Sequence, residues 1–153
     1  MAVHKADKLN KNEKAKKYAL FLLKFSPRTR LEMVRRLEAK GFAADEIKEA
    51  LNFLESGQYV DDAKFIRLYL GQKIDKPVPF EKIREAILLK GVEESFLEEE
   101  LKSNPVPAEE ERIFNLAQWK LEKTPALQKE RLKDYFLRQG FDELDVDRAM
   151  ERL

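Results

Sequence analysis

The sequence contains no cysteine, one histidine and only five glycines in 153 residues. Without cysteine the chain forms no disulfide bond and no thiolate metal site. The single histidine, His4, leaves no Ser–His–Asp triad and no histidine cluster for a metal ion. Glycine-rich phosphate-binding loops are missing as well. We therefore expect no enzymatic activity, no cofactor and no metal.

Long apolar runs are also missing. No stretch approaches the roughly 18–20 apolar residues that a membrane-spanning helix requires. The first eight residues lack the apolar core of a secretion signal. We therefore expect a soluble, cytoplasmic protein without a membrane partner. Abundant Leu, Glu, Lys and Ala, with little glycine, favour helices over strands.

A pattern centred on a glycine occurs three times, at Gly41, Gly91 and Gly140, with separations of 50 and 49 residues. Apolar residues stand eight and four positions before each glycine and one, six and ten positions after it. These fifteen positions are Met33, Leu37, Phe42, Ile47 and Leu51; Ile83, Ile87, Val92, Leu97 and Leu101; and Leu132, Phe136, Phe141, Val146 and Met150. The spacing of four places each set on one helical face. Glycine suits the left-handed position that ends a helix, so each unit contains a helix–Gly–helix corner.

These corners predict an all-α fold of nine helices, arranged as three tandem three-helix repeats in an elongated, curved array. The boundaries are a flexible tail over 1–10, a basic first repeat over 11–58, a second over 59–104 and a third over 105–153. In the first repeat, helices are expected over about 12–25, from the cap to residue 40, and over 44–56. In the second they are expected from 62 to near 71, over 80–90 and over 93–102. In the third, one helix begins at 108, the next ends at 139 and the last ends at 153. Ser26 or Thr29, Asp61 and Thr124 (followed by Pro125) are the expected helix caps.

Charge is unevenly distributed along the chain. Residues 1–50 carry 13 Lys and Arg against 7 Asp and Glu, whereas residues 51–105 carry 8 against 11 and residues 106–153 carry 9 against 11. Between positions 14 and 36 only Glu32 is acidic. The basic cluster consists of Lys14, Lys16, Lys17, Lys24, Arg28, Arg30, Arg35 and Arg36. It is either a solvated helical face or a surface that binds a polyanion or an acidic protein.

Other polar and aromatic groups have simpler structural explanations. Asp61 and Asp62 resemble a paired carboxylate site, but we expect them to cap a helix and to occupy its first turn. Trp119, Phe114 and Tyr135 are able to stack on bases. Since aromatic residues on helices are mostly core residues, we expect these three in the core.

The residues of the first repeat resemble those of the RecX family of bacterial recombination regulators. The resemblance rests on Tyr18-Ala19-Leu20-x-Leu22-Leu23, Thr29-x-x-Glu32, Leu37-x-x-Lys40-Gly41-Phe42, Ile47-x-x-x-Leu51-x-x-Leu54 and Val60-Asp61-Asp62-x-x-Phe65. The second and third repeats agree through Gly91 and Gly140 and their apolar neighbours. Two departures occur: Lys24-Phe25 replaces a dibasic pair, and Thr29-x-x-Glu32-Met33 replaces Ser-x-x-Glu-Leu.

The resemblance implies a chain of tandem three-helix repeats that binds the RecA recombinase, chiefly its filament on single-stranded DNA. It also implies restraint of the ATPase and strand-exchange activities of RecA. The basic first repeat would then contact the filament or its single- or double-stranded DNA. The alternative is a stand-alone DNA-binding module of helix-turn-helix-like units. Against it, the third helices of the first two repeats offer only Lys48 and Lys102, and the last helix is rich in acidic residues.

Overall fold

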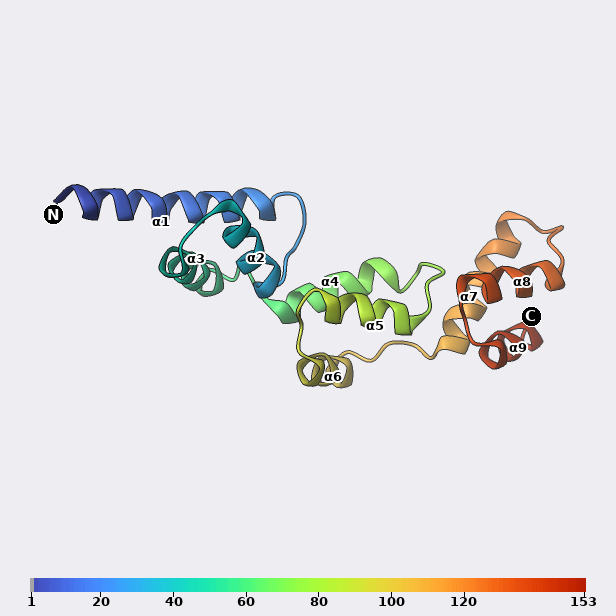
Figure 1. Cartoon of the computed structure of the whole chain (residues 1–153). Helices are drawn as coiled ribbons and strands as arrows, with labels where there is room; N and C mark the ends of the chain where they lie inside the picture. The colour runs from blue at the N-terminus through green and yellow to red at the C-terminus, as the bar shows by residue number, and fades with distance from the viewer. Residues whose placement is uncertain (1) are drawn as a thin grey trace.

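A computed structural model describes the backbone of residues 2–153 and the side chains of residues 10–153. Over residues 2–153 the chain forms nine α-helices and no strand (Figure 1). The helices are α1 (Ala2–Leu23), α2 (Arg30–Lys40), α3 (Ala44–Ser56), α4 (Asp62–Lys73), α5 (Phe80–Leu89), α6 (Glu94–Ser103), α7 (Glu109–Lys123), α8 (Lys129–Gln139) and α9 (Glu143–Glu151). None of them combines the length and the apolar character needed to cross a bilayer.

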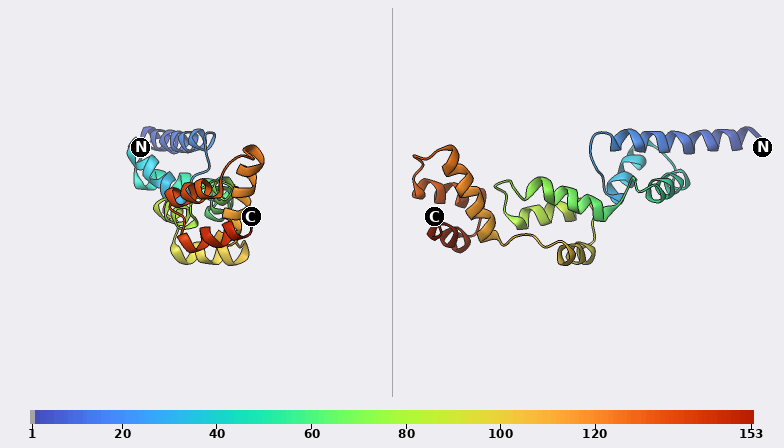
Figure 2. Two further views of the ribbon diagram at one scale, coloured as in Figure 1. Left: turned by 90° about the vertical axis from the view of Figure 1, so that its right-hand side faces the viewer. Right: turned by 180° about the vertical axis from the view of Figure 1, so that it is seen from behind.

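The helices group in threes along one long axis, with α1 and α9 at opposite ends of the molecule (Figures 1 and 2). Each group encloses its own apolar core, formed by α1–α3, by α4–α6 and by α7–α9. Of the fifteen matched apolar positions, all are buried except Phe42 and Leu101, which are half-buried. The predicted all-α fold of three tandem three-helix repeats in an elongated array is therefore confirmed.

The three repeat glycines adopt the left-handed conformation, with φ of +97° at Gly41, +94° at Gly91 and +99° at Gly140. A side chain with a Cβ is strained at such a φ, so glycine lets the chain leave one helix and turn into the next. The residue after each glycine then packs back against the core of its repeat. The predicted helix–Gly–helix corners are confirmed.

Two of the predicted caps are present. The Thr29 hydroxyl accepts the backbone N–H of Glu32 at 3.1 Å, and the Glu32 carboxylate accepts the N–H of Thr29 at 3.3 Å, which completes a capping box at the start of α2. Asp61 caps α4 by accepting the N–H of Lys64 at 3.2 Å. Thr29, rather than Ser26, is therefore the cap that fixes where the second helix begins.

The prediction that Thr124 and Pro125 begin the eighth helix was wrong. Thr124 ends α7 with φ of −139° and ψ of 79°, outside the α region that a following proline disfavours. Its carbonyl then accepts the N–H of Leu127 at 3.0 Å in a turn, and α8 begins only at Lys129. The pair therefore ends one helix instead of starting the next.

The first helix is longer than predicted. It begins at Ala2 instead of near residue 12, so residues 2–10, expected to form a flexible tail, have helical backbone. The segment contains no glycine or proline, and its two Ala, two Lys and one Leu favour helix. In Figure 1 this part of α1 extends beyond α2 and α3.

Neighbouring repeats are joined by the start of each middle helix. The first residue of α2, Arg30, donates its backbone N–H to the carboxylate of Asp62, the first residue of α4, at 2.9 Å. The first residue of α5, Phe80, donates in the same way to Glu109, the first residue of α7, at 2.8 Å. Both joints thus use one pattern, in which an acidic side chain satisfies a free N–H group at a helix start.

The same joints include the glycine corner of the following repeat. The Thr29 hydroxyl donates to the carbonyl of Lys90 at the end of α5, and the Lys82 ammonium donates to the carbonyl of Gln139 at the end of α8 at 3.2 Å. Gly91 lies so close to Leu31 that a Cβ there would come within 2.3 Å of its side chain. At Gly41, which has no preceding repeat among the described residues, the same position has no atom within 4 Å.

Candidate partner-binding surface

Five members of the basic cluster are exposed and have no ion pair in the part of the chain described here: Lys14, Lys17, Lys24, Arg35 and Arg36. Lys14 and Lys17 on α1 lie away from the buried Ala15, Ala19 and Leu22, because α1 packs that apolar face against α3, and Lys24 follows the last residue of α1. On α2 the arginines lie away from the buried Met33 and Leu37. These five cations are available to a partner.

Of the other three members of the cluster, Lys16 and Arg30 interact within the molecule and Arg28 is half-buried. Lys16 forms an ion pair with Glu13 at 3.6 Å, and its ammonium lies 5.3 Å from the centre of the Phe53 ring. Arg30 donates through Nε to Glu55 at 2.7 Å. The Nε of Arg28 is shielded from solvent and has no hydrogen-bond partner among the described residues. The predicted cluster therefore contains five exposed cations that a partner can reach and three residues that are engaged or half-buried within the first repeat.

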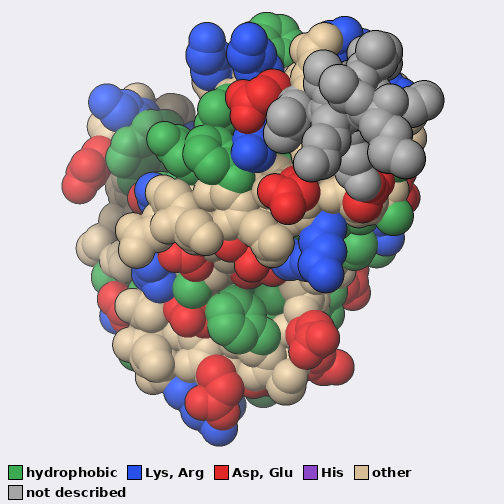
Figure 3. Space-filling view, turned by 90° about the vertical axis from the view of Figure 1, so that its left-hand side faces the viewer, with side chains coloured by type: hydrophobic (Ala, Val, Ile, Leu, Met, Phe, Trp, Pro, Cys, Tyr) green, Lys and Arg blue, Asp and Glu red, His purple; other side chains and the backbone are tan. Residues whose placement is uncertain are grey.

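The five free cations form two groups instead of one continuous patch. One group is Lys14 and Lys17 on α1 with Lys24 just after its end, and the other is Arg35 and Arg36 on α2. Each helix packs the face opposite its cations against the same core. At the end of the molecule shown in Figure 3, Lys and Arg side chains are interspersed with Asp and Glu side chains on the described surface. The excess of positive charge over residues 1–50 is therefore distributed over more than one side of the first repeat.

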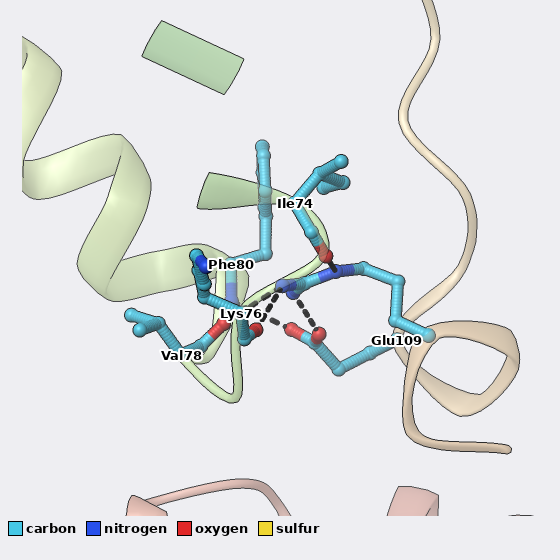
Figure 4. A network of polar contacts seen from close by, with 6 residues as sticks. Ile74, Lys76, Val78, Phe80 and Glu109 are labelled. Carbon is cyan, nitrogen blue, oxygen red and sulfur yellow. Dashed lines mark hydrogen bonds and ion pairs between the residues drawn. The ribbon is translucent and has the colours of Figure 1, made fainter. Parts of the chain in front are cut away.

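The junction between the second and third repeats is fixed by a buried arginine (Figure 4). Arg112 of α7 is 4% exposed. It forms an ion pair with Glu109, and its guanidinium donates to the carbonyls of Ile74 at 3.1 Å, Lys76 at 3.3 Å and Val78 at 2.9 Å. A fixed guanidinium with several donors suits such a set of acceptors. Arg112 therefore holds the loop between α4 and α5 against α7.

A cleft lies beside this junction, and it contains a residue that the sequence analysis assigned to the core. Trp119 is 56% exposed and lines the cleft, whereas Phe114 and Tyr135 are half-buried and pack against the third core. The prediction of a core position was wrong for Trp119. Ile113 and Ala117 form the buried stripe of α7, and Trp119 lies two residues beyond Ala117, which turns it away from that stripe.

The acidic pair behaves as predicted: Asp61 caps α4, and Asp62 lies in its first turn and joins the repeats. Burial raises the pKa of the Asp62 carboxyl, an effect that the hydrogen bond from Arg30 opposes. Within residues 10–153 no group of acidic or histidine side chains is arranged to hold a metal ion. His4 lies outside the residues whose side chains are described.

Two solved structures share this arrangement of helices. A crystal structure of RecX from Lactobacillus salivarius superposes with a TM-score of 0.70 at 20% sequence identity, over 95% of this chain and 97% of that one. A crystal structure of a regulatory protein RecX gives a TM-score of 0.68 at 18% identity, over 97% of this chain and 76% of that one. At these identities the likeness establishes the fold.

Sequence comparison decides the family. Residues 15–54 match the family model described as RecX, first three-helix domain. A regulatory protein RecX from Caldanaerobacter subterraneus subsp. tengcongensis is 27% identical over 139 residues, which cover 90% of this chain and 70% of the relative. One from Clostridium perfringens is 31% identical over 107 residues, which cover 70% of this chain and 50% of the relative. The chain belongs to the RecX family.

Membership in the RecX family agrees with the architecture, and the match to the family model covers most of the first repeat, including Thr29, Gly41 and the core residues between them. The relatives are described as regulatory proteins. The chain spans about half the length of the clostridial RecX relatives that it matches at 31% identity. Their activity and partners are therefore carried to this chain only as a proposal.

Proposed function

We propose that this chain binds along the filament that the RecA recombinase forms on DNA and inhibits its ATPase and strand-exchange activities during recombination and DNA repair. The observation that carries the proposal is membership in the RecX family over an elongated array of three repeats. An elongated molecule offers a long contact surface, which suits a partner that is itself a polymer. The chain would therefore act through the contacts that it makes along the filament.

Inhibition would follow from contact with more than one RecA subunit at once. A filament that hydrolyses ATP passes through different arrangements of its subunits. A rigid molecule that bridges neighbouring subunits binds one arrangement better than the others and shifts the population toward it. The paired joints and the Arg112 contacts hold the three repeats in a defined relation, which such bridging requires.

The five free cations of the first repeat would supply long-range attraction. RecA–DNA filaments contain exposed phosphates, and arginine binds phosphate or carboxylate through two parallel hydrogen bonds. Arg35 and Arg36 are exposed and have no ion pair among the described residues, so they are the first residues to test.

The deciding experiment adds the purified chain to RecA on single-stranded DNA in the presence of ATP. We expect ATP hydrolysis and strand exchange to fall as the concentration of the chain rises. Unchanged rates at a concentration that saturates the filament would refute the proposal. Tight binding to DNA in the absence of RecA, with a steep dependence on salt, would instead support the stand-alone DNA-binding module.

A further inference from the structure

The cleft beside the junction of the second and third repeats has the size and lining of a binding site. Its volume is about 510 Å³, within the range of about 300–1,000 Å³ typical of ligand pockets. Six apolar residues line it: Ile74, Pro77, Pro107, Leu116, Trp119 and Tyr135. They come from the loop between α4 and α5, the linker before α7, and α7 and α8. The cleft therefore exists only where two repeats meet.

Trp119 is not part of the apolar core of its own repeat. It lies outside the buried core of the third repeat, and 56% of its surface remains exposed. Leaving much of so large an apolar side chain in water forgoes the free energy of burial. Tryptophan is enriched among the residues that dominate binding at protein interfaces, where it is buried by the partner. Its position indicates a surface completed by another molecule.

The walls of the cleft are fixed before any partner arrives. Arg112 binds the carbonyls of Ile74, Lys76 and Val78, which holds the loop that forms one side. On the other side Tyr135 packs edge-on against Phe136 with ring centres 5.2 Å apart, and the Lys120 ammonium lies 3.9 Å from the centre of the Tyr135 ring. A preformed site binds more tightly because less ordering accompanies binding.

Positive charge predominates at the cleft. Lys76 and Lys120 line it, and the Lys123 ammonium lies 6.0 Å from the centre of the Trp119 ring. Asp75 is the acidic residue among the lining side chains, while Arg112 is already paired with Glu109. An apolar site with lysines around it complements an apolar side chain that has acidic neighbours.

We propose that this cleft receives an apolar side chain, flanked by acidic residues, from a subunit of the RecA filament. This inference rests on the proposed function. Trp119 forms the apolar contact and the lysines contact the flanking carboxylates. A stacked nucleotide base is the rival occupant, since tryptophan also stacks on bases. The aliphatic and prolyl walls favour a side chain, because base-stacking platforms present open ring faces along a basic groove.

The test uses the fact that Trp119 is the only tryptophan in the chain. Replacing it biosynthetically with 5-hydroxytryptophan gives a probe that can be excited where ordinary tryptophan absorbs little. Acrylamide quenching of its emission is measured for three samples: the labelled chain by itself, the chain with RecA filaments on single-stranded DNA, and the chain with a thymidine oligonucleotide without RecA. We expect filaments to reduce the quenching constant about two-fold and the oligonucleotide to leave it unchanged.

Affinity for the filament is then measured by co-sedimentation for three variants. We expect Trp119→Ala to weaken binding about ten-fold or more and Trp119→Phe to restore most of the loss. The matched control is Leu89→Ala on α5, which removes an apolar side chain that is 80% exposed outside the cleft and should leave affinity unchanged. Because Trp119 lies outside the core, its variants should melt at the wild-type temperature.

The outcomes separate this inference from the proposed function. If the wild-type chain does not bind filaments, both fail. If the wild-type chain binds, but Trp119→Ala binds equally well and the probe stays accessible to acrylamide, the cleft is not the contact and the proposed function stands. Protection of the probe by the oligonucleotide alone would identify a nucleotide as the occupant and overturn the inference.

Discussion

The backbone N–H of Arg30 donates a 2.9 Å hydrogen bond to the carboxylate of Asp62, which lies in the next repeat. The contact joins the starts of two helices, α2 and α4, whose N-terminal N–H groups lack partners within their own helices. Burial raises the pKa of this carboxyl. The joint therefore holds an acid whose charged form is less favourable in the folded protein than in the unfolded chain.

This pKa shift predicts a specific dependence of stability on pH. Where its pKa is raised, the folded protein still binds a proton that the unfolded chain has released, so stability falls as pH rises through the carboxyl range. Asp62→Asn keeps an acceptor oxygen for Arg30 and removes this dependence. We expect the variant to gain stability relative to wild type between roughly pH 4 and 6. Urea unfolding at a series of pH values measures the gain, and a gain that shrinks as pH rises would contradict the assignment.

Two glycine substitutions separate backbone strain from the packing of the joint. Gly41→Ala should cost about 1–2 kcal/mol, because its φ is left-handed but the space around it is open. Gly91→Ala has the same strain and also brings a Cβ against Leu31, so it should cost about 1–3 kcal/mol more. Denaturant unfolding of both variants checks the difference. Equal losses would mean that Leu31 moves aside freely.

Thr29 caps a helix and also joins two repeats. Thr29→Val keeps the shape but removes the hydroxyl that caps α2 and donates to the carbonyl of Lys90. A lost cap and an unpaired buried carbonyl together should cost about 2–4 kcal/mol. The control is Thr124→Val, at an exposed threonine that caps no helix start, which should cost less than about 0.5 kcal/mol. Similar losses in the two variants would show that the joint adds nothing.

Arg112 should be the residue on which the second junction depends. Arg112→Met leaves the three carbonyls of the loop and the Glu109 carboxylate without their buried partner, at a cost of about 3–5 kcal/mol. Amide hydrogen exchange should speed up over residues 74–80 and stay unchanged over 30–54. The control, Arg84→Met, removes exposed ion pairs to Glu94 and Glu98, which solvent screens, and should cost much less than the loss of Arg112.

The exposed arginines of α2 test the proposed electrostatic contact. Replacing Arg35 and Arg36 together by Glu should weaken filament binding, while helicity and melting temperature stay near those of wild type, because both side chains are exposed. The matched control makes the same change of charge at Lys129 and Arg131, exposed residues of α8. Inhibition of RecA that survives the α2 change would remove these arginines from the interface. Equal effects from both pairs would point to net charge alone.

The sequence predicted those features of the fold that depend on residues close together in the chain. Periodic apolar residues and three glycines were enough to predict the corners, since a left-handed helix end selects glycine strongly. The start of α8 was missed because Thr124 and Pro125 match a helix start as well as a helix end. The N-terminal part of α1 is not predicted because its polar residues also suit a disordered tail, although the segment contains no helix breaker.

The surface was less predictable, because exposure depends on which face a helix buries. Trp119 lies about 200° around α7 from Ala117, so the helical wheel could have placed it outside the core. Which residues of the basic cluster are free and which are engaged within the molecule could be learned only from the structure. Arg30 reaches Glu55 only because α2 and α3 pack together, and Arg112 reaches its carbonyls only because two repeats meet. Contacts between distant segments leave no local signal in a single sequence.

The repeated joint has a consequence for how such a molecule changes over time. Each joint is made from the start of one middle helix and the end of the next, so a unit of about fifty residues carries both halves of the contact. Duplication of one unit would insert a module that already matches its neighbours. Length, and with it the number of partner subunits spanned, is therefore a property that simple genetic duplication or loss can adjust without redesign of any core.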